Sequence, residues 1–174
     1  IKLSDYLIQE KHKIIYTNGN ASNKVAITFD DAPDYYITSQ IIDILKRYHV
    51  KATFSVIGAH IENNEHLIKQ IYQDGHDIMN HTWNHTYLSQ QCEETIWDEL
   101  ERTEIRIANI IGKTPALVRT PHGDFDDRVL AILKKRFKKL ILWSYNTFDW
   151  VATCKEDIIN DMAGKIRGGD IIVM

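Results

Sequence analysis

The segment Val-Ala-Ile-Thr-Phe-Asp-Asp, residues 25–31, is an apolar run that ends in two adjacent aspartates. The same arrangement, a short apolar run followed directly by polar residues, recurs at residues 78–85, 116–123 and 140–150. A further apolar run closes the sequence at residues 171–174. Parallel strands that alternate with helices bring their carboxyl ends to one face. We therefore expect these polar residues, which lie far apart in the sequence, to share one pocket.

Helical patterns separate these apolar runs. Apolar residues at helical spacing predict helices over residues 37–48, 64–74, 92–111, 126–136 and 155–166, and a β-rich run at residues 52–57 predicts another strand. Gly75 and Gly112 follow the second and third of these helices, a position where glycine commonly ends a helix. Alternating β and α units predict an α/β fold, an irregular (β/α) barrel of about seven parallel strands.

The start of the chain is predicted to form a short β-hairpin. An apolar run at residues 14–16 is followed by Asn18-Gly19, a dipeptide typical of tight hairpin turns, and the chain then returns into residues 25–29. We expect an N-terminal strand or hairpin extension over residues 1–23 and one domain over residues 24–174. A chain of 174 residues is long enough for one domain with a substantial core and short for two.

The composition is that of an ordinary globular protein, with 44% hydrophobic and 26% charged residues. A net charge of -3 argues against a nucleic-acid partner, which would call for a basic surface. No apolar stretch approaches the roughly 20 residues of a membrane span. The only cysteines, Cys92 and Cys154, form no Cys-x-x-Cys pair, so a zinc knuckle is not expected. Spacing alone leaves a disulfide between them open.

The polar clusters contain the residue types of a metal-assisted hydrolase. His81 and His85 are four residues apart, so one helical turn would place both imidazoles on the same face. With a carboxylate such as Asp31 they would form a ligand set that leaves positions open for water. Neighbouring strand residues point to opposite sides, so Asp30 could act as a base while Asp31 binds the cation. Surface histidines and helix-capping aspartates are the simpler interpretation of each pair taken alone.

Arg119 directly follows an apolar run and precedes Pro121, which stiffens the backbone. An arginine in this place could hold a carboxylate in one orientation and keep it ionised. A surface salt bridge is the more common role of an arginine, and the same holds for Asp149. Trp150 could line an apolar slot, although most tryptophans belong to a core.

In this order the clusters resemble the polysaccharide deacetylases with a NodB-homology domain, carbohydrate esterase family four. The resemblance covers roughly residues 24–174. The segment Thr-Phe-Asp-Asp-Ala-Pro at residues 28–33 is similar to the family's Thr-Phe-Asp-Asp-Gly-Pro, and His-Thr-Trp-Asn-His at residues 81–85 matches His-Ser/Thr-x-x-His. Arg-Thr-Pro-His-Gly at residues 119–123 is similar to Arg-x-Pro-Tyr-Gly, and Asn-Thr-Phe-Asp-Trp at residues 146–150 to Asp-x-x-Asp-Trp.

The resemblance implies a role for each matched residue. Asp30 would be the general base, oriented by Arg119, and Asp149 would tune the general acid. A divalent metal would be held by Asp31, His81 and His85. Zinc is the expected metal from the ligand types, and cobalt or manganese would also fit. Substrate contacts are expected from Pro121, His122 and Trp150, with the His122 backbone N–H stabilising the oxyanion.

The reaction implied by the resemblance is metal-dependent hydrolysis of N-acetyl groups on an N-acetylglucosamine-type polysaccharide, with release of acetate. Peptidoglycan and chitin oligomers are both possible substrates, and such polymers imply an extracytoplasmic protein, secreted or associated with the cell envelope. Two alternatives stay open. One is a non-catalytic glycan-binding or regulatory domain on the same fold. The other is a different amide hydrolase of the same superfamily.

The sequence departs from the family pattern in four places. Ala32 replaces a glycine, which strains the backbone only where φ is positive. His122 replaces an aromatic residue and Asn146 replaces an aspartate. The family's last motif, Leu-x-His, supplies the histidine that protonates the leaving amine. The sequence stops at Met174, one residue before that histidine, and it begins without a methionine. We therefore expect a domain truncated at its C-terminus.

Overall fold

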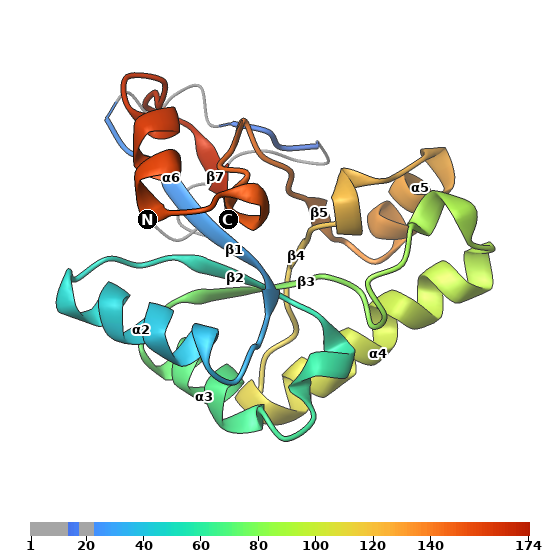
Figure 1. Cartoon of the computed structure of the whole chain (residues 1–174). Coiled ribbons are helices and arrows are strands. Elements are labelled where there is room, and N and C mark those ends of the chain that lie inside the picture. The colour runs from blue at the N-terminus through green and yellow to red at the C-terminus, as the bar shows by residue number, and fades with distance from the viewer. Residues whose placement is uncertain (1–13, 18–22) are drawn as a thin grey trace.

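The fold is built on one parallel sheet. A computed structural model describes residues 14–17 and 23–174. The strands are β1 (Ala26–Ala32), β2 (Thr53–Val56), β3 (Asp77–Asn80), β4 (Leu117–Val118), β5 (Lys139–Leu140), β6 (Tyr145–Asn146) and β7 (Ile171–Val173). The seven strands have the order β5-β4-β3-β2-β1-β7-β6, and every pairing is parallel. The sheet curls into a half-barrel (Figure 1), which confirms the predicted α/β barrel of about seven parallel strands.

The segment before β1 closes part of this half-barrel. Ile15 forms a parallel bridge with Ile141, and Thr17 forms an antiparallel bridge with Asp170. Ile141 directly follows β5, at one edge of the sheet, and Asp170 directly precedes β7, next to the strand at the other edge. The predicted turn at residues 18–19 lies outside the described residues. Within the described part of the chain, residues 15 and 17 pair with these partners and not with β1, so the hairpin is not confirmed.

Five α-helices connect the strands in the described part of the chain. They are α2 (Ile37–Arg47), α3 (Glu65–Gln73), α4 (Glu93–Ile111), α5 (Asp127–Lys135) and α6 (Lys155–Met162). The first four begin and end within one residue of the predicted bounds, whereas α6 ends four residues earlier than expected. Gly112 ends α4 with a left-handed φ of 71°. The side chain of Asp126 caps α5 by accepting a hydrogen bond from the Val129 N–H.

Four short 3-10 helices lie between these elements. They are η1 (Gly58–Ile61), η2 (Leu88–Gln90), η3 (Pro121–Gly123) and η4 (Asp149–Val151). Each of them follows a strand on the carboxyl side of the sheet. The connections at this face are therefore irregular, and they include the polar clusters singled out in the sequence.

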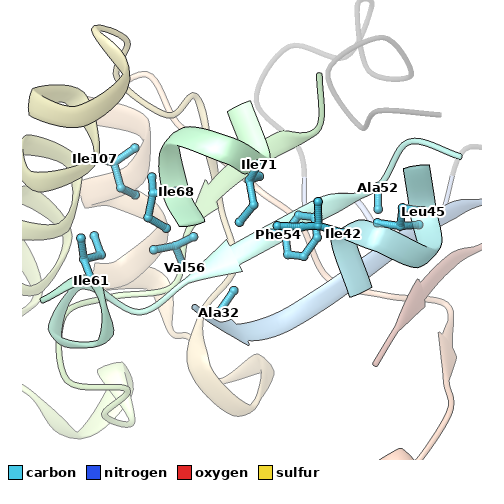
Figure 2. Packing of buried hydrophobic residues seen from close by; sticks show 10 residues of the cluster. All are labelled: Ala32, Ile42, Leu45, Ala52, Phe54, Val56, Ile61, Ile68, Ile71 and Ile107. Atoms are coloured by element: carbon cyan, nitrogen blue, oxygen red, sulfur yellow. The ribbon is translucent and has the colours of Figure 1, made fainter. Parts of the chain in front are cut away.

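The largest buried hydrophobic cluster joins β1 and β2 to helices α2, α3 and α4 (Figure 2). Its members are Ala32, Ile42, Leu45, Ala52, Phe54, Val56, Ile61, Ile68, Ile71 and Ile107. All four residues of β2 are buried, which is typical of a parallel strand covered on both faces. Because apolar burial is the main favourable term in folding, this cluster fixes the positions of the strand ends next to it.

Two further observations concern the cysteines and the helices. Cys92 and Cys154 are both free and exposed, so the disulfide left open by the sequence is not formed. Among the helices of residues 14–17 and 23–174, none combines the length and the apolar character that crossing a bilayer would require.

Candidate active site

Asp30 and Asp31 lie at the end of β1, where the strand is irregular. The pairing with β2 shifts register between Phe29 and Ala32, and Asp31 has a left-handed φ of 60°. The expectation that the two carboxylates point to opposite sides is therefore wrong. Both approach the same atom, His81 Nε2, with Asp30 Oδ2 at 3.8 Å and Asp31 Oδ1 at 3.5 Å. Ala32 is not among the described residues with positive φ, so its replacement of glycine brings no strain there.

His81 and His85 belong to the loop that follows β3. The predicted helical turn is not formed, because Thr82 and His85 have left-handed φ values of 66° and 57°. Thr82 bridges the loop, since its Oγ1 accepts a hydrogen bond from the His85 N–H at 3.1 Å. The imidazole centroids lie 4.9 Å apart, and His85 Nε2 is 3.3 Å from Asp31 Oδ1. The histidines thus meet through the loop conformation and not through helical spacing.

Asp31, His81 and His85 form a cluster that fits a divalent metal. Each residue offers one ligand atom, and these atoms all lie within 4.8 Å of one another. His81 Nδ1 donates a hydrogen bond to the Arg119 carbonyl oxygen at 2.7 Å, which fixes the ring and leaves Nε2 facing Asp31. Two imidazole nitrogens and one carboxylate oxygen are ligands that zinc, cobalt and manganese accept.

The pKa values of Asp31 and His85 are shifted in directions that suit metal binding. A hydrogen bond from His81 lowers the pKa of Asp31, against the opposing effect of burial. Burial lowers the pKa of His85, and the neighbouring His81 lowers it further. An ionised carboxylate and a neutral imidazole are the forms that bind a metal ion.

Arg119 lies fully buried beneath the pocket and is held at every nitrogen. Its Nη1 donates to Asp30 Oδ1 at 2.8 Å and to Thr28 Oγ1 at 2.6 Å. Its Nε donates to the Ile141 carbonyl oxygen at 3.2 Å, and its Nη2 donates to the Leu142 carbonyl oxygen at 3.0 Å. The contact with Asp30 that an orienting arginine needs is therefore present. Arg119 binds only Oδ1 of Asp30, and Oδ2 faces His81.

His122 forms one wall of the site. It has a left-handed φ of 59°, and its ring stacks on Tyr87 with centroids 4.1 Å apart and planes 17° apart. Its other neighbour is His85, at a centroid distance of 4.7 Å. Pro121, for which a substrate contact was expected, is buried at the start of η3 and does not line the pocket. Its position indicates a role in shaping the backbone before His122.

One pocket of about 500 Å³ collects these side chains, and its volume is in the usual range for ligand sites. It is lined by Asp30, Asp31, His81, His85, His122, Trp143, Asn146, Asp149, Trp150, Val173 and Met174. The sequence patterns predict no role for Trp143, Val173 or Met174. The signal was present, because Trp143 ends an apolar run that directly precedes a polar cluster. Its ring lies close to Gly123, where an added Cβ would be 3.1 Å from Trp143 Cη2.

The loop after β6 forms the outer rim of the pocket. Asn146 Oδ1 accepts a hydrogen bond from the Phe148 N–H at 2.9 Å, so the residue that replaces the family's aspartate shapes this loop. The Thr147 hydroxyl lies 3.1 Å from Asp149 Oδ1. Phe148 and Trp150 are 53% and 66% exposed, with ring centroids 5.4 Å apart. The rim therefore offers aromatic surface to solvent beside the polar floor of the pocket.

Comparison with known proteins assigns the chain to a family. The sequence pattern of the polysaccharide deacetylases matches residues 17–137, more than half of the chain. The chain belongs to the polysaccharide deacetylase family. A peptidoglycan-N-acetylglucosamine deacetylase of Bacillus cereus is 34% identical over 157 residues, which are 89% of this chain and 73% of that relative.

Solved structures agree with this assignment. A crystal structure of a peptidoglycan N-acetylglucosamine deacetylase, in complex with 4-naphthalen-1-yl-N-oxidanyl-benzamide, has a TM-score of 0.89 and 30% identity, covering 92% of this chain and 75% of that one. A pseudoenzyme of carbohydrate esterase family four from Bacillus anthracis has a TM-score of 0.88 and 25% identity, covering 95% of this chain and 59% of that one. Members of this family thus include both deacetylases and a pseudoenzyme.

Proposed function

We propose that this polysaccharide deacetylase domain is a metal-dependent enzyme that removes N-acetyl groups from an N-acetylglucosamine-type polysaccharide and releases acetate. One observation supports this most strongly. Asp30 is paired with the buried Arg119, and its free oxygen points toward the cluster of Asp31, His81 and His85 in one pocket. Helix caps and surface salt bridges do not account for this arrangement, because Arg119 is buried and Asp30 keeps one oxygen open to the pocket.

The metal is proposed to be held by Asp31, His81 and His85. Zinc is our choice from the two imidazole nitrogens, and cobalt or manganese would also fit the ligand set. A divalent cation bound there would supply Lewis-acid polarisation of the amide carbonyl and would activate water.

The proton steps are assigned to the residues around this cluster. Asp30 is proposed to take the proton of the attacking water through Oδ2, because Arg119 occupies Oδ1 and leaves Oδ2 facing the pocket. The His122 backbone N–H is proposed to stabilise the oxyanion. The Met174 carbonyl oxygen accepts a hydrogen bond from the Asp30 N–H at 2.9 Å. A residue that followed Met174 would emerge beside Asp30, where the family's histidine acid is needed, and Asp149 is proposed to tune that acid.

Substrate binding is assigned to the exposed aromatic surface around the pocket. Trp150 and His122 line the pocket from different loops, and Phe148 and Tyr87 extend these two walls outward. Flat aromatic faces present large apolar area to a ring-shaped ligand. The peptidoglycan-N-acetylglucosamine deacetylase of Bacillus cereus supports a cell-wall glycan as the substrate, and hence an extracytoplasmic location.

The test is acetate release from N-acetylglucosamine oligomers and from peptidoglycan, measured with added zinc and with a chelator. The chain should extend past Met174, so that the expected histidine is present. Zinc-dependent acetate release would support the proposal, and the preferred polymer would define the substrate. Bound zinc without any acetate release would contradict it.

A non-catalytic glycan-binding domain is the second candidate. Asn146 stands in place of the family's aspartate, and the relatives include a pseudoenzyme. This candidate predicts glycan binding without turnover in a chain of full length. The intact pair of Asp30 and Arg119 favours the enzyme, because a binding domain has no need of an oriented base.

A further inference from the structure

Helix α4 holds the loop that contains His81 and His85 through one buried carboxylate. Glu99 is 3% exposed. Its Oε2 accepts hydrogen bonds from the Trp83 N–H at 2.9 Å and from the Asn84 N–H at 2.7 Å. Its Oε1 accepts a third, from Asn84 Nδ2 at 2.6 Å. All three donors belong to Trp83 and Asn84, which lie between His81 and His85 in the sequence.

A carboxylate buried in this way needs compensation, because removing a charge from water costs several kcal/mol. No cation of the described residues lies within ion-pair distance of Glu99. A second buried carboxylate of the same helix differs in this respect, because Glu104 pairs with Arg136 at 2.8 Å and with Lys138 at 3.3 Å. The charge of Glu99 is therefore balanced by the hydrogen bonds of the loop and not by a salt bridge.

The loop requires such support because its backbone is strained. Thr82 and His85 both have left-handed φ values, which cost side-chain-bearing residues free energy. The start of the loop is fixed by Asn80, whose Oδ1 accepts a hydrogen bond from the Thr82 N–H and whose Nδ2 donates to the Leu100 carbonyl oxygen. Glu99 fixes its middle. Both anchors lead to the same part of α4.

We propose that Glu99 is a positioning residue that sets the separation of the two imidazoles and so determines how tightly the site binds its metal. The proposal rests on the proposed function only in requiring that a divalent metal binds Asp31, His81 and His85. Glu99 acts through the backbone N–H groups of Trp83 and Asn84, and it needs no contact with substrate or metal.

Two substitutions can separate the effect of the hydrogen-bond geometry of Glu99 from the effect of its charge. A glutamine could keep its amide oxygen at the Oε2 position and accept both backbone hydrogen bonds. Its NH₂ group would then face Asn84, whose side-chain amide can flip to offer an oxygen. An aspartate keeps the charge but withdraws both oxygens by one methylene. Glu99→Gln thus preserves the anchor without charge, and Glu99→Asp preserves the charge without the anchor.

The experiment measures zinc affinity by competition with a chromophoric chelator, and the thermal unfolding of the metal-free protein, for wild type and these two variants. Glu99→Asp is expected to bind zinc about 10–100-fold more weakly, the range for loss of a group that supports metal ligands. Glu99→Gln is expected to stay within about threefold of wild type. The matched control Glu104→Asp shortens a buried carboxylate of the same helix, and it should lower the unfolding temperature without changing zinc affinity.

The possible results separate this proposal from the proposed function. Equal zinc affinities in wild type and Glu99→Asp, or equal losses in Glu99→Asp and Glu104→Asp, would overturn the positioning role alone. A larger loss in Glu99→Gln than in Glu99→Asp would also overturn it, because charge would then matter more than geometry. Failure of the wild-type protein to bind zinc would overturn the proposed function and this proposal together.

Discussion

The two sides of the pocket are built differently. The inner side, formed by Asp30, His81 and Arg119, is almost closed to solvent, with His81 1% and Arg119 0% exposed. Its hydrogen bonds join segments that are far apart in the sequence, such as Arg119 and Thr28. In the outer rim, formed by Phe148, Asp149 and Trp150, the two aromatic residues are more than half exposed. Its backbone is shaped by contacts within its own loop, such as that between Asn146 and Phe148.

This difference assigns different tasks to the two sides. A side chain that is fixed by several partners from several strands keeps its geometry, as a group that moves protons must. A rim held mainly by its own loop can change without disturbing those groups. We therefore expect substitutions on the inner side to lower kcat and stability, and substitutions on the rim to raise KM.

Arg119→Lys is expected to have the largest effect. A lysine has three donors on one nitrogen and cannot reach the acceptors on Thr28, Asp30, Ile141 and Leu142 together. Breaking a buried charged pair costs about 3–5 kcal/mol of unfolding free energy, which urea unfolding would measure. Deacetylation should fall by at least about 100-fold, the lower end of the contribution of a general base. A variant with wild-type stability and turnover would contradict the importance of the inner side.

Gly58→Ala tests the inner side from a more distant position. An added Cβ would lie 2.4 Å from Trp83 Cε3 and 2.6 Å from Thr103 Oγ1, so Trp83 and the loop of His81 and His85 would have to move. We expect a loss of about 1–3 kcal/mol in unfolding free energy, as for other overpacked sites, together with weaker zinc binding.

A matched control for this substitution is Gly112→Ala at the end of α4. An added Cβ there meets nothing within 4 Å, although the left-handed φ of 71° makes alanine unfavourable by about 1–2 kcal/mol. The control should lower stability in urea and leave zinc affinity unchanged. If both variants weaken zinc binding alike, the contact between Gly58 and Trp83 does not position the metal ligands.

Trp150→Ala is expected to have a smaller effect of another kind. Trp150 lines the pocket and is 66% exposed, so its removal takes away contact area for the substrate without disturbing the inner side. We expect KM for an N-acetylglucosamine oligomer to rise about tenfold, which corresponds to about 1.4 kcal/mol, with kcat little changed. A fall in kcat as large as that of Arg119→Lys would remove the distinction between the two sides.

Phe148→Ala is expected to have the smallest effect. Phe148 lies against Trp150 but does not line the pocket itself. A rise in KM of about threefold, well under 1 kcal/mol, is expected for long oligomers, and none for the shortest. Steady-state kinetics with oligomers of increasing length would measure this dependence. The same rise for every oligomer length would show that Phe148 acts only by supporting Trp150.

Much of the fold follows from local patterns in the sequence. Helices α2 to α5 could be predicted because an apolar stripe at helical spacing depends on the helix alone, and Gly112 marks the end of α4. The site residues could be found because Asp30, Asp31, His81 and His85 directly follow apolar runs. Their grouping then follows from the parallel arrangement of strands, without knowledge of any single contact.

What could not be predicted depends on contacts between distant segments. The left-handed backbone at Asp31 turns its carboxylate toward His81, against the alternation of an ideal strand. Glu99 lies on the buried face of a helix, where the sequence shows only a charged residue, and its partners are 15 and 16 positions away. The pairing of Ile15 with Ile141 likewise joins two segments that are far apart in the sequence. Local turn signals give no information on such partners.

The central claim is that Asp30 moves the proton while Asp31 holds the metal, although both carboxylates lie close to His81 Nε2. The most direct test is to measure zinc content and acetate release together in Asp30→Asn. We predict that this variant retains its zinc and loses about 10²–10⁴-fold in turnover, the contribution of a general base. Loss of zinc from Asp30→Asn would contradict the claim, because the roles of the two aspartates would then be exchanged.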